Sequence, residues 1–171
     1  MRAYLSAFLV TSVLLSAAYF AVAAQKTKHH VTVTEVESDA LAKVRTYTWT
    51  VSHPSFDKAA DRQIIAAVDR ELMARGRTRL ATGRGDAEVT YASLSRTDVD
   101  LKSEPSATGE RRTYPVGILV VQVRDSASGR MLFNAKVHSP IDTEPAKLEA
   151  TINAATAAIF KKFPGHPAAK D

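Results

Sequence analysis

The chain has 171 residues, of which 45% are hydrophobic and 24% are charged, the composition of an ordinary globular protein. It contains no cysteine, which excludes disulfide bonds, thiol catalysis, cysteine-ligated zinc and the lipid-bearing cysteine of a bacterial lipoprotein. The formal net charge of +5 favours anionic partners, such as phospholipid headgroups or lipopolysaccharide phosphates.

The N-terminal residues have the three-part layout of a bacterial export signal. Arg2 precedes an uncharged apolar run over residues 3–24, and this run ends in small residues just before the first lysines. The pattern predicts a signal peptide over residues 1–24, cleaved after Ala23 or Ala24, and therefore a periplasmic location. The alternative is an uncleaved anchor in the inner membrane, because about 20 apolar residues can span a bilayer.

The rest of the chain is long enough for one domain. A polar lead-in over residues 25–30 precedes a single globular domain, which we predict over 31–164, and a disordered polar tail over 165–171. The β-branched residues over 31–36 predict the first strand of this domain.

Alternating residues predict the next strands. Tyr47 and Trp49 share one face of a strand, and we assign them to the core rather than to a ligand-stacking face. Val89 and Tyr91 likewise share one face of a later strand. The run over 116–123 is the most hydrophobic of all, so this strand is expected at the centre of the sheet.

Helical spacing predicts a first long helix from about Asp57 to Arg75. Asp57 or Ser55 can cap its start, and Gly76 stands where a left-handed residue ends a helix. A second long helix near the C-terminus ends before Pro164. Five residues of strands and helices are predicted to share one core: Val89, Leu119, Val121, Ile152 and Ile159.

The order β-β-α-β-β-β-α predicts an α/β fold of the α+β type, built as a two-layer sandwich. We expect a mixed, mostly antiparallel sheet of about five strands with two helices packed on one face. The first long helix should cross between two parallel strands, and the last three strands should form an antiparallel meander. The polar segment 102–113 is expected to be a long mobile loop.

Five segments, taken in order, resemble a known family. They are residues 41–49, with Thr-Tyr-x-Trp; 71–76, a helix exit ending in Gly; 86–91, with Asp-x-x-Val-x-Tyr; 117–125, a Gly-x-Leu-Val strand ending in Asp; and 161–164, Lys-Lys-Phe-Pro. The family is domain-of-unknown-function family 4136, which comprises small bacterial envelope proteins, many of them lipoproteins. The resemblance implies an envelope location and carries no biochemical activity.

The densest basic segment follows the first long helix. It contains Arg70, Arg75, Arg77, Arg79 and Arg84. Cations at a helix C-terminus complement the helix dipole, which is one interpretation of these residues. The other is an exposed patch that contacts an anion, since Arg77 stands where the family prefers an apolar residue. We expect Asp86 to close the turn after this segment.

Other polar residues give weaker hypotheses. His29 and His30 are neighbours on an extended segment, so they point to opposite sides and do not predict a metal site. Asp98, Asp100 and Glu104 are interpreted as a solvated strand end rather than a carboxylate site.

We find no catalytic, metal-binding or cofactor-binding signature. The sequence therefore predicts a non-enzymatic accessory or interaction module of the cell envelope, without a cofactor and without nucleic acid as partner. The expected partner is an envelope protein or an anionic envelope surface, and the membrane is contacted peripherally or through an uncleaved N-terminus. The alternatives are an enzyme with an unrecognised polar site and an N-terminally anchored form of the same module.

Overall fold

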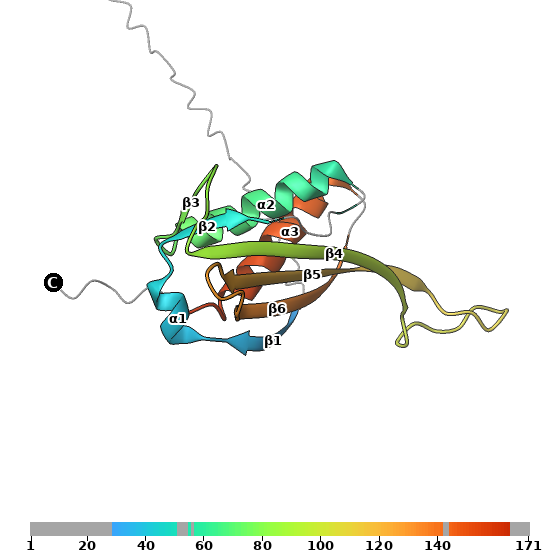
Figure 1. The fold of residues 1–171 in the computed structure, drawn as a ribbon. Coiled ribbons are helices and arrows are strands. Elements are labelled where there is room, and N and C mark those ends of the chain that lie inside the picture. Colours follow the sequence, from blue (N-terminus) through green and yellow to red (C-terminus); the bar gives the residue numbers. More distant parts are fainter. Residues whose placement is uncertain (1–28, 51–54, 56, 142–143, 165–171) are drawn as a thin grey trace, which may run out of the picture.

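The computed structural model describes residues 29–50, 55, 57–141 and 144–164 (Figure 1). The predicted signal peptide over 1–24 and the predicted tail lie outside these residues. In chain order the elements are β1 His30–Val36, α1 Ser38–Lys43, β2 Thr46–Trp49, α2 Lys58–Met73, β3 Thr78–Arg79, β4 Ala87–Val99, β5 Thr113–Asp125, β6 Met131–Pro140 and α3 Pro145–Phe160.

The strands form one mixed sheet in the order β1-β6-β5-β4-β2-β3. β2 runs parallel to β3 and β4, and the other neighbouring pairs are antiparallel. The predicted crossover is confirmed, because α2 connects the parallel strands β2 and β4. The predicted meander is confirmed too, since β4, β5 and β6 are consecutive antiparallel neighbours.

The described residues form six strands and three helices, rather than about five strands and two helices. The sequence did not predict α1 and β3 because they have 6 and 2 residues, too few for a periodic pattern. Backbone contacts define β3: Thr78 N donates to Arg45 O and Leu80 N donates to Tyr47 O, each at 2.8 Å.

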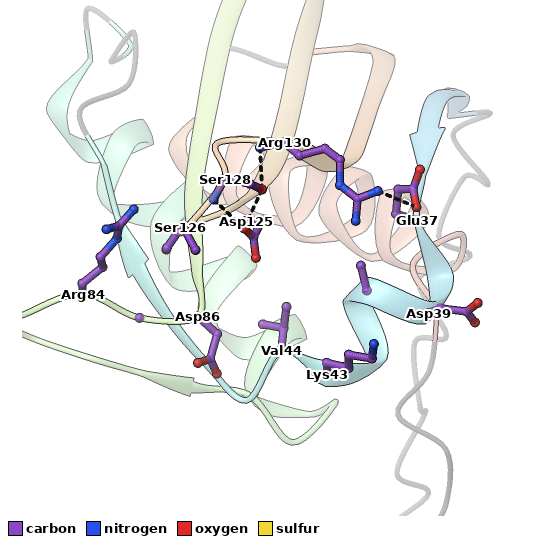
Figure 2. A pocket seen from close by; sticks show the side chains of 13 residues that line it. Glu37, Asp39, Lys43, Val44, Arg84, Asp86, Asp125, Ser126, Ser128 and Arg130 are labelled. Atoms are coloured by element: carbon purple, nitrogen blue, oxygen red, sulfur yellow. Dashed lines mark hydrogen bonds and ion pairs between the residues drawn. The ribbon is translucent and has the colours of Figure 1, made fainter.

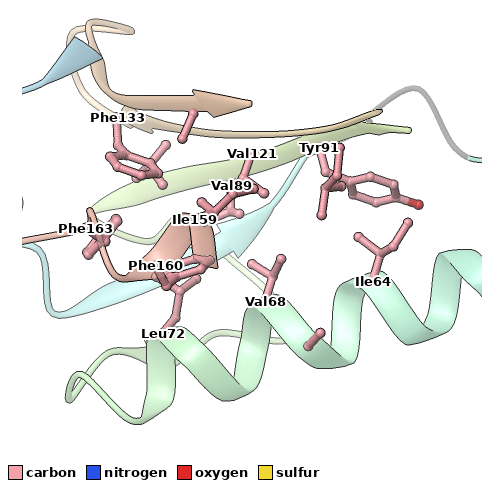
Figure 3. Close-up of a cluster of buried hydrophobic side chains, with 14 of the residues drawn as sticks. Ile64, Val68, Leu72, Val89, Tyr91, Val121, Phe133, Ile159, Phe160 and Phe163 are labelled. Carbon is pink, nitrogen blue, oxygen red and sulfur yellow. The ribbon is translucent and has the colours of Figure 1, made fainter. Parts of the chain in front are cut away.

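α2 and α3 lie on one face of the sheet (Figure 1). Their apolar side chains meet those of the sheet in one core (Figure 3), and the five predicted core residues are all buried in it. Tyr47 is 1% exposed and Trp49 packs against the same core, which confirms the core interpretation of both aromatics. None of the helices in the described part of the chain has the length and apolarity needed to cross a membrane.

The ends of α2 follow the predicted signals. The Asp57 carboxylate accepts a hydrogen bond from Ala59 N at 2.7 Å, so Asp57 caps the helix. Gly76 has a φ of 76°, a left-handed conformation that glycine adopts without strain. The helix itself ends at Met73, because the last residues before Gly76 form a turn.

The segment between β4 and β5 projects beyond the sheet, which the sequence did not predict. β6 pairs with β5 only as far as Val116, whereas β4 and β5 stay paired as far as Val99 and Thr113. Residues 97–115, called the arm below, therefore extend beyond the rest of the sheet as a two-stranded ribbon (Figure 1). The predicted loop over 102–113 is confirmed, because β4 ends at Val99 and β5 begins at Thr113. It is closed by backbone hydrogen bonds such as that from Ser106 N to Glu110 O at 2.7 Å. Its mobility stays a prediction.

Candidate functional site

The arm exposes large apolar side chains. Val99 is 50% exposed and Leu101 77%, and Tyr114 and Leu94, which stands at the base of the arm, are exposed as well. These are four of the six large apolar side chains that are exposed among the described residues. Several large apolar side chains exposed in one region are typical of interaction surfaces, which makes the arm a candidate interaction surface.

Two ion pairs link charged side chains in and next to the arm. Arg112 forms an ion pair with Asp100 at 2.8 Å, and Arg96 pairs with Asp98 at 2.7 Å. The hydrogen bond from Arg112 is the main cause of a lowered pKa at Asp100. Asp98 and Asp100 therefore order the hairpin, and Glu104 is exposed beside them. This arrangement fits a solvated strand end, as the sequence predicts.

An apolar cleft of about 430 Å³ lies at the base of the arm, between α2, α3 and the sheet. Ile64 of α2, Ile152 of α3 and Leu119 of β5 contribute aliphatic walls. Five further lining residues carry hydroxyl groups: Ser55, Ser93, Ser95, Ser139 and Thr151. The cleft therefore suits an aliphatic group that is accompanied by a few polar atoms.

A polar cavity of about 650 Å³ lies at the opposite end of the sheet, between α1 and the β5–β6 turn (Figure 2). Glu37 pairs with Arg130 at 3.3 Å across it. Ser128 donates to the Asp125 carboxylate from its hydroxyl at 2.6 Å and its backbone N at 2.7 Å, and these bonds lower the pKa of Asp125. Ser126 Oγ is buried without a hydrogen-bond partner among the described residues. The ion pair and the hydrogen bonds of these charged groups thus hold the residues that line the cavity in position.

Asp86, at the edge of the polar cavity, does not close its own turn as expected. Its carboxylate accepts hydrogen bonds from Arg45 N and Thr46 N, each at 2.9 Å, at the start of β2. These two backbone bonds lower the pKa of Asp86. The approach is close, since a Cβ on Gly85 would lie 2.8 Å from Tyr47 Cα. Sequence reasoning missed the contact because its partners are remote in the chain.

Arg77 is buried, in contrast to the interpretation of an exposed patch. It is 2% exposed, and its guanidinium donates to Leu41 O at 3.1 Å and to Arg75 O. The same group lies 5.4 Å from the centre of the Phe163 ring. Burial lowers the pKa of Arg77. Arg77 can be accommodated here because carbonyl groups that end α1 and α2 accept its hydrogen bonds.

The other four predicted arginines occupy separate places. Arg75 and Arg79 form ion pairs with carboxylates of α2, at 2.7 and 2.6 Å. Arg70 is exposed between α2 and α3, where it donates to Asn153 Oδ1 at 2.8 Å. Arg84 is exposed at the polar cavity, away from Arg70. Anion contact by these residues stays a prediction.

Asp69 of α2 is the centre of a polar network that links this helix to β2 and β3. The sequence analysis did not predict this network. It accepts hydrogen bonds from Tyr47 Oη at 2.7 Å, from Trp49 Nε1 at 2.9 Å and from Arg79 at 2.6 Å. Burial and the Asp69 carboxylate raise the pKa of Tyr47. The signal in the sequence was the carboxylate of Asp69, which directly follows the apolar residue Val68 in the helix. All three donors to Asp69 are side chains of the protein itself, so the network contributes to the stability of the core.

The N-terminal histidines lie at the edge strand. His30 stands opposite His138 in the β1–β6 register, and burial lowers the pKa of His29 and of His138. Within the described residues, no three His, Asp or Glu side chains lie close enough together to hold a metal ion.

Comparison with known families relates this fold to other proteins. Residues 32–165 match the model of the family described as Domain of unknown function (DUF4136). The chain belongs to this family. The match includes all five segments in which the sequence resembles it. No curated protein matches the chain.

Solved structures share the fold of this DUF4136 domain at low sequence identity. The PelC dodecamer from Paraburkholderia phytofirmans has a TM-score of 0.57 and 11% identity, and the alignment covers 81% of this chain and 99% of that chain. A substituted variant of that dodecamer has a TM-score of 0.50 and 12% identity, with coverages of 77% and 97%. Rare lipoprotein B from Shewanella oneidensis is more distant, with a TM-score of 0.41, 10% identity, and coverages of 68% and 92%.

Proposed function

We propose that the protein is an exported, non-enzymatic accessory component of the bacterial cell envelope that works as an assembly of several copies. The observation that carries this proposal is the arm, with Val99 and Leu101 exposed on a ribbon that leaves the sheet. The export-type N-terminus and the family support the location. The fold likeness to PelC, a dodecamer, supports assembly of identical copies.

An enzyme is the alternative, and the polar cavity would be its site. A catalytic carboxylate must be free to accept a proton from the substrate or to donate one to it. Asp86 and Asp125 instead accept short hydrogen bonds from neighbouring backbone and side-chain groups, which hold both in the charged form. This favours a structural role for the cavity walls and hence the accessory function.

The location is tested by expressing the chain with its own N-terminus in a bacterial host. We expect the periplasmic fraction to contain protein cleaved after Ala23 or Ala24, as measured by intact mass. Full-length protein confined to the membrane pellet would support the anchored alternative instead.

Assembly is tested on the same processed protein by light scattering and native mass spectrometry over a range of micromolar concentrations. We expect masses that are multiples of one chain. A monomer at every concentration would contradict the proposal.

A further inference from the structure

We propose that the arm of one copy inserts into the apolar cleft of the next copy, so that copies join head to tail. The inference rests on the proposed self-assembly and names the contact that builds it.

The arm cannot fill the cleft of its own domain. The cleft lies at the base of the arm, where Leu94 and Gly117 contribute to its lining. From this base the arm extends away from α2 and α3 (Figure 1). Its exposed apolar side chains, Val99 and Leu101, therefore reach a cleft only on a second molecule.

The chemistry of the two surfaces is complementary. The cleft offers the aliphatic walls of Ile64, Leu119 and Ile152, and the arm offers a leucine that is 77% exposed. Hydroxyl groups that line the cleft can bond to peptide groups of an entering ribbon, which would otherwise lose their contact with water.

Three charged groups near Leu101 in the hairpin already have partners. Burying an unpaired charge is strongly unfavourable, whereas a paired and hydrogen-bonded charge loses much less. In the arm Asp100 is already paired with Arg112, and Arg111 donates to the carbonyls of Leu101 and Ser103. Insertion of Leu101 therefore leaves Asp100 and Arg112 paired, while the exposed Lys102, Glu104 and Glu110 must keep contact with water at the mouth of the cleft.

Because arm and cleft are different surfaces, the contact is heterologous. Each copy then offers a free arm at one end and a free cleft at the other, and repetition gives a closed ring or an open filament. This distinguishes the proposal from a two-fold dimer in which two arms pack together.

The absence of native cysteine allows a direct test by crosslinking single-cysteine variants of the processed protein. Leu101→Cys marks the arm and Thr151→Cys marks the cleft. Ala66→Cys, on an exposed position of α2 outside the cleft, is the matched control. We expect oxidation or a short bismaleimide to join Leu101→Cys to Thr151→Cys when the two variants are mixed. The mixture of Leu101→Cys with Ala66→Cys should not crosslink.

Each other outcome is decisive. Crosslinking of Leu101→Cys to itself would show arm-to-arm packing and overturn the proposal. An oligomer in native mass spectrometry without the arm–cleft crosslink would overturn this contact but leave the proposed assembly intact. A co-purified lipid adduct that Thr151→Trp removes would show that the cleft holds an aliphatic ligand, and would also overturn the proposal. A monomer would contradict both proposals.

A second measurement compares two variants that add the same charge, one in the arm and one outside it. Leu101→Asp should weaken assembly by about tenfold or more, the loss expected for one buried leucine. Ala66→Asp, at the exposed position of α2 outside both the arm and the cleft, should leave assembly unchanged. Both variants should keep the thermal melt of the monomer, since both positions are exposed. Equal assembly of the two variants would overturn the proposal.

Discussion

Thr46 and Asp86 hold each other through reciprocal hydrogen bonds. Thr46 N donates to Asp86 Oδ2 at 2.9 Å, and Asp86 N donates to Thr46 Oγ1 at 3.1 Å. The two residues are 40 positions apart and stand at the start of the parallel pair β2–β4, just before the Tyr47–Ala87 register. They belong to two of the segments in which the chain resembles its family, so the pair gives a physical reason for both motifs.

Removing the Asp86 carboxylate should destabilise the fold. Asp86→Ala removes two charge-assisted hydrogen bonds to backbone N–H groups, and we expect a loss of about 1 kcal/mol because the site is exposed. Urea unfolding measures the change. Glu104→Ala, an exposed carboxylate on the arm, is the control and should stay within about 0.5 kcal/mol of the wild type.

The same pair predicts a pH dependence. The pKa of Asp86 is lowered in the folded state, so its contribution is present above the unfolded value of about 4 and is lost as the pH falls through the folded value. The stability difference between wild type and Asp86→Asn should therefore be largest near neutral pH and shrink in acid. Urea melts in a pH series test this. A difference that does not change with pH would contradict the assignment.

Arg77 should contribute to stability rather than to binding. Arg77→Ala leaves the carbonyls of Leu41 and Arg75 without these donors and opens space beside Phe163, so we expect a loss of about 3 kcal/mol. Arg77→Met keeps the packing and should lose about 1 kcal/mol. The exposed Arg84→Ala is the control. If Arg77→Ala resembled Arg84→Ala in a denaturant melt, the buried position of Arg77 would be wrong.

Ile159→Ala and Ile152→Ala should differ in their effects. Both isoleucines are buried in the core, where such truncations lose about 2–5 kcal/mol. Ile159 is fully buried, whereas Ile152 also lines the open cleft, where solvent already meets part of its surface. We expect a loss near the upper end of the range for Ile159→Ala and near the lower end for Ile152→Ala. Equal losses would indicate that the cleft is closed in solution.

Anion contact by the basic segment remains testable with the exposed members alone. Vesicles with anionic lipid should sediment the wild type at low salt and lose it at high salt, because screening shortens the range of surface charges. If the segment contributes, Arg70→Gln combined with Arg84→Gln should reduce sedimentation. Arg77→Met should not reduce it, because Arg77 is buried. Equal sedimentation of wild type and double variant would restrict these arginines to structural roles.

The sequence by itself determined the order of the long elements, the core and the family. Ile64 and Leu72 recur at helical spacing and Val89 and Tyr91 at strand spacing, and such periodicity records which side of an element is buried. Local signals also placed the Asp57 cap and the left-handed Gly76, because both depend on residues next to them in the chain.

Only the tertiary structure decided the contacts between segments that are remote in the chain. Asp86 bonds to the start of β2, and Arg77 is buried against Leu41, because folding brings together groups that no local pattern relates. The arm shows the same limit. Its polar sequence predicts the loop, but only the structure shows that β4–β5 pairing continues past Val116 as far as Val99 and Thr113, so that the loop with Leu101 projects into solvent.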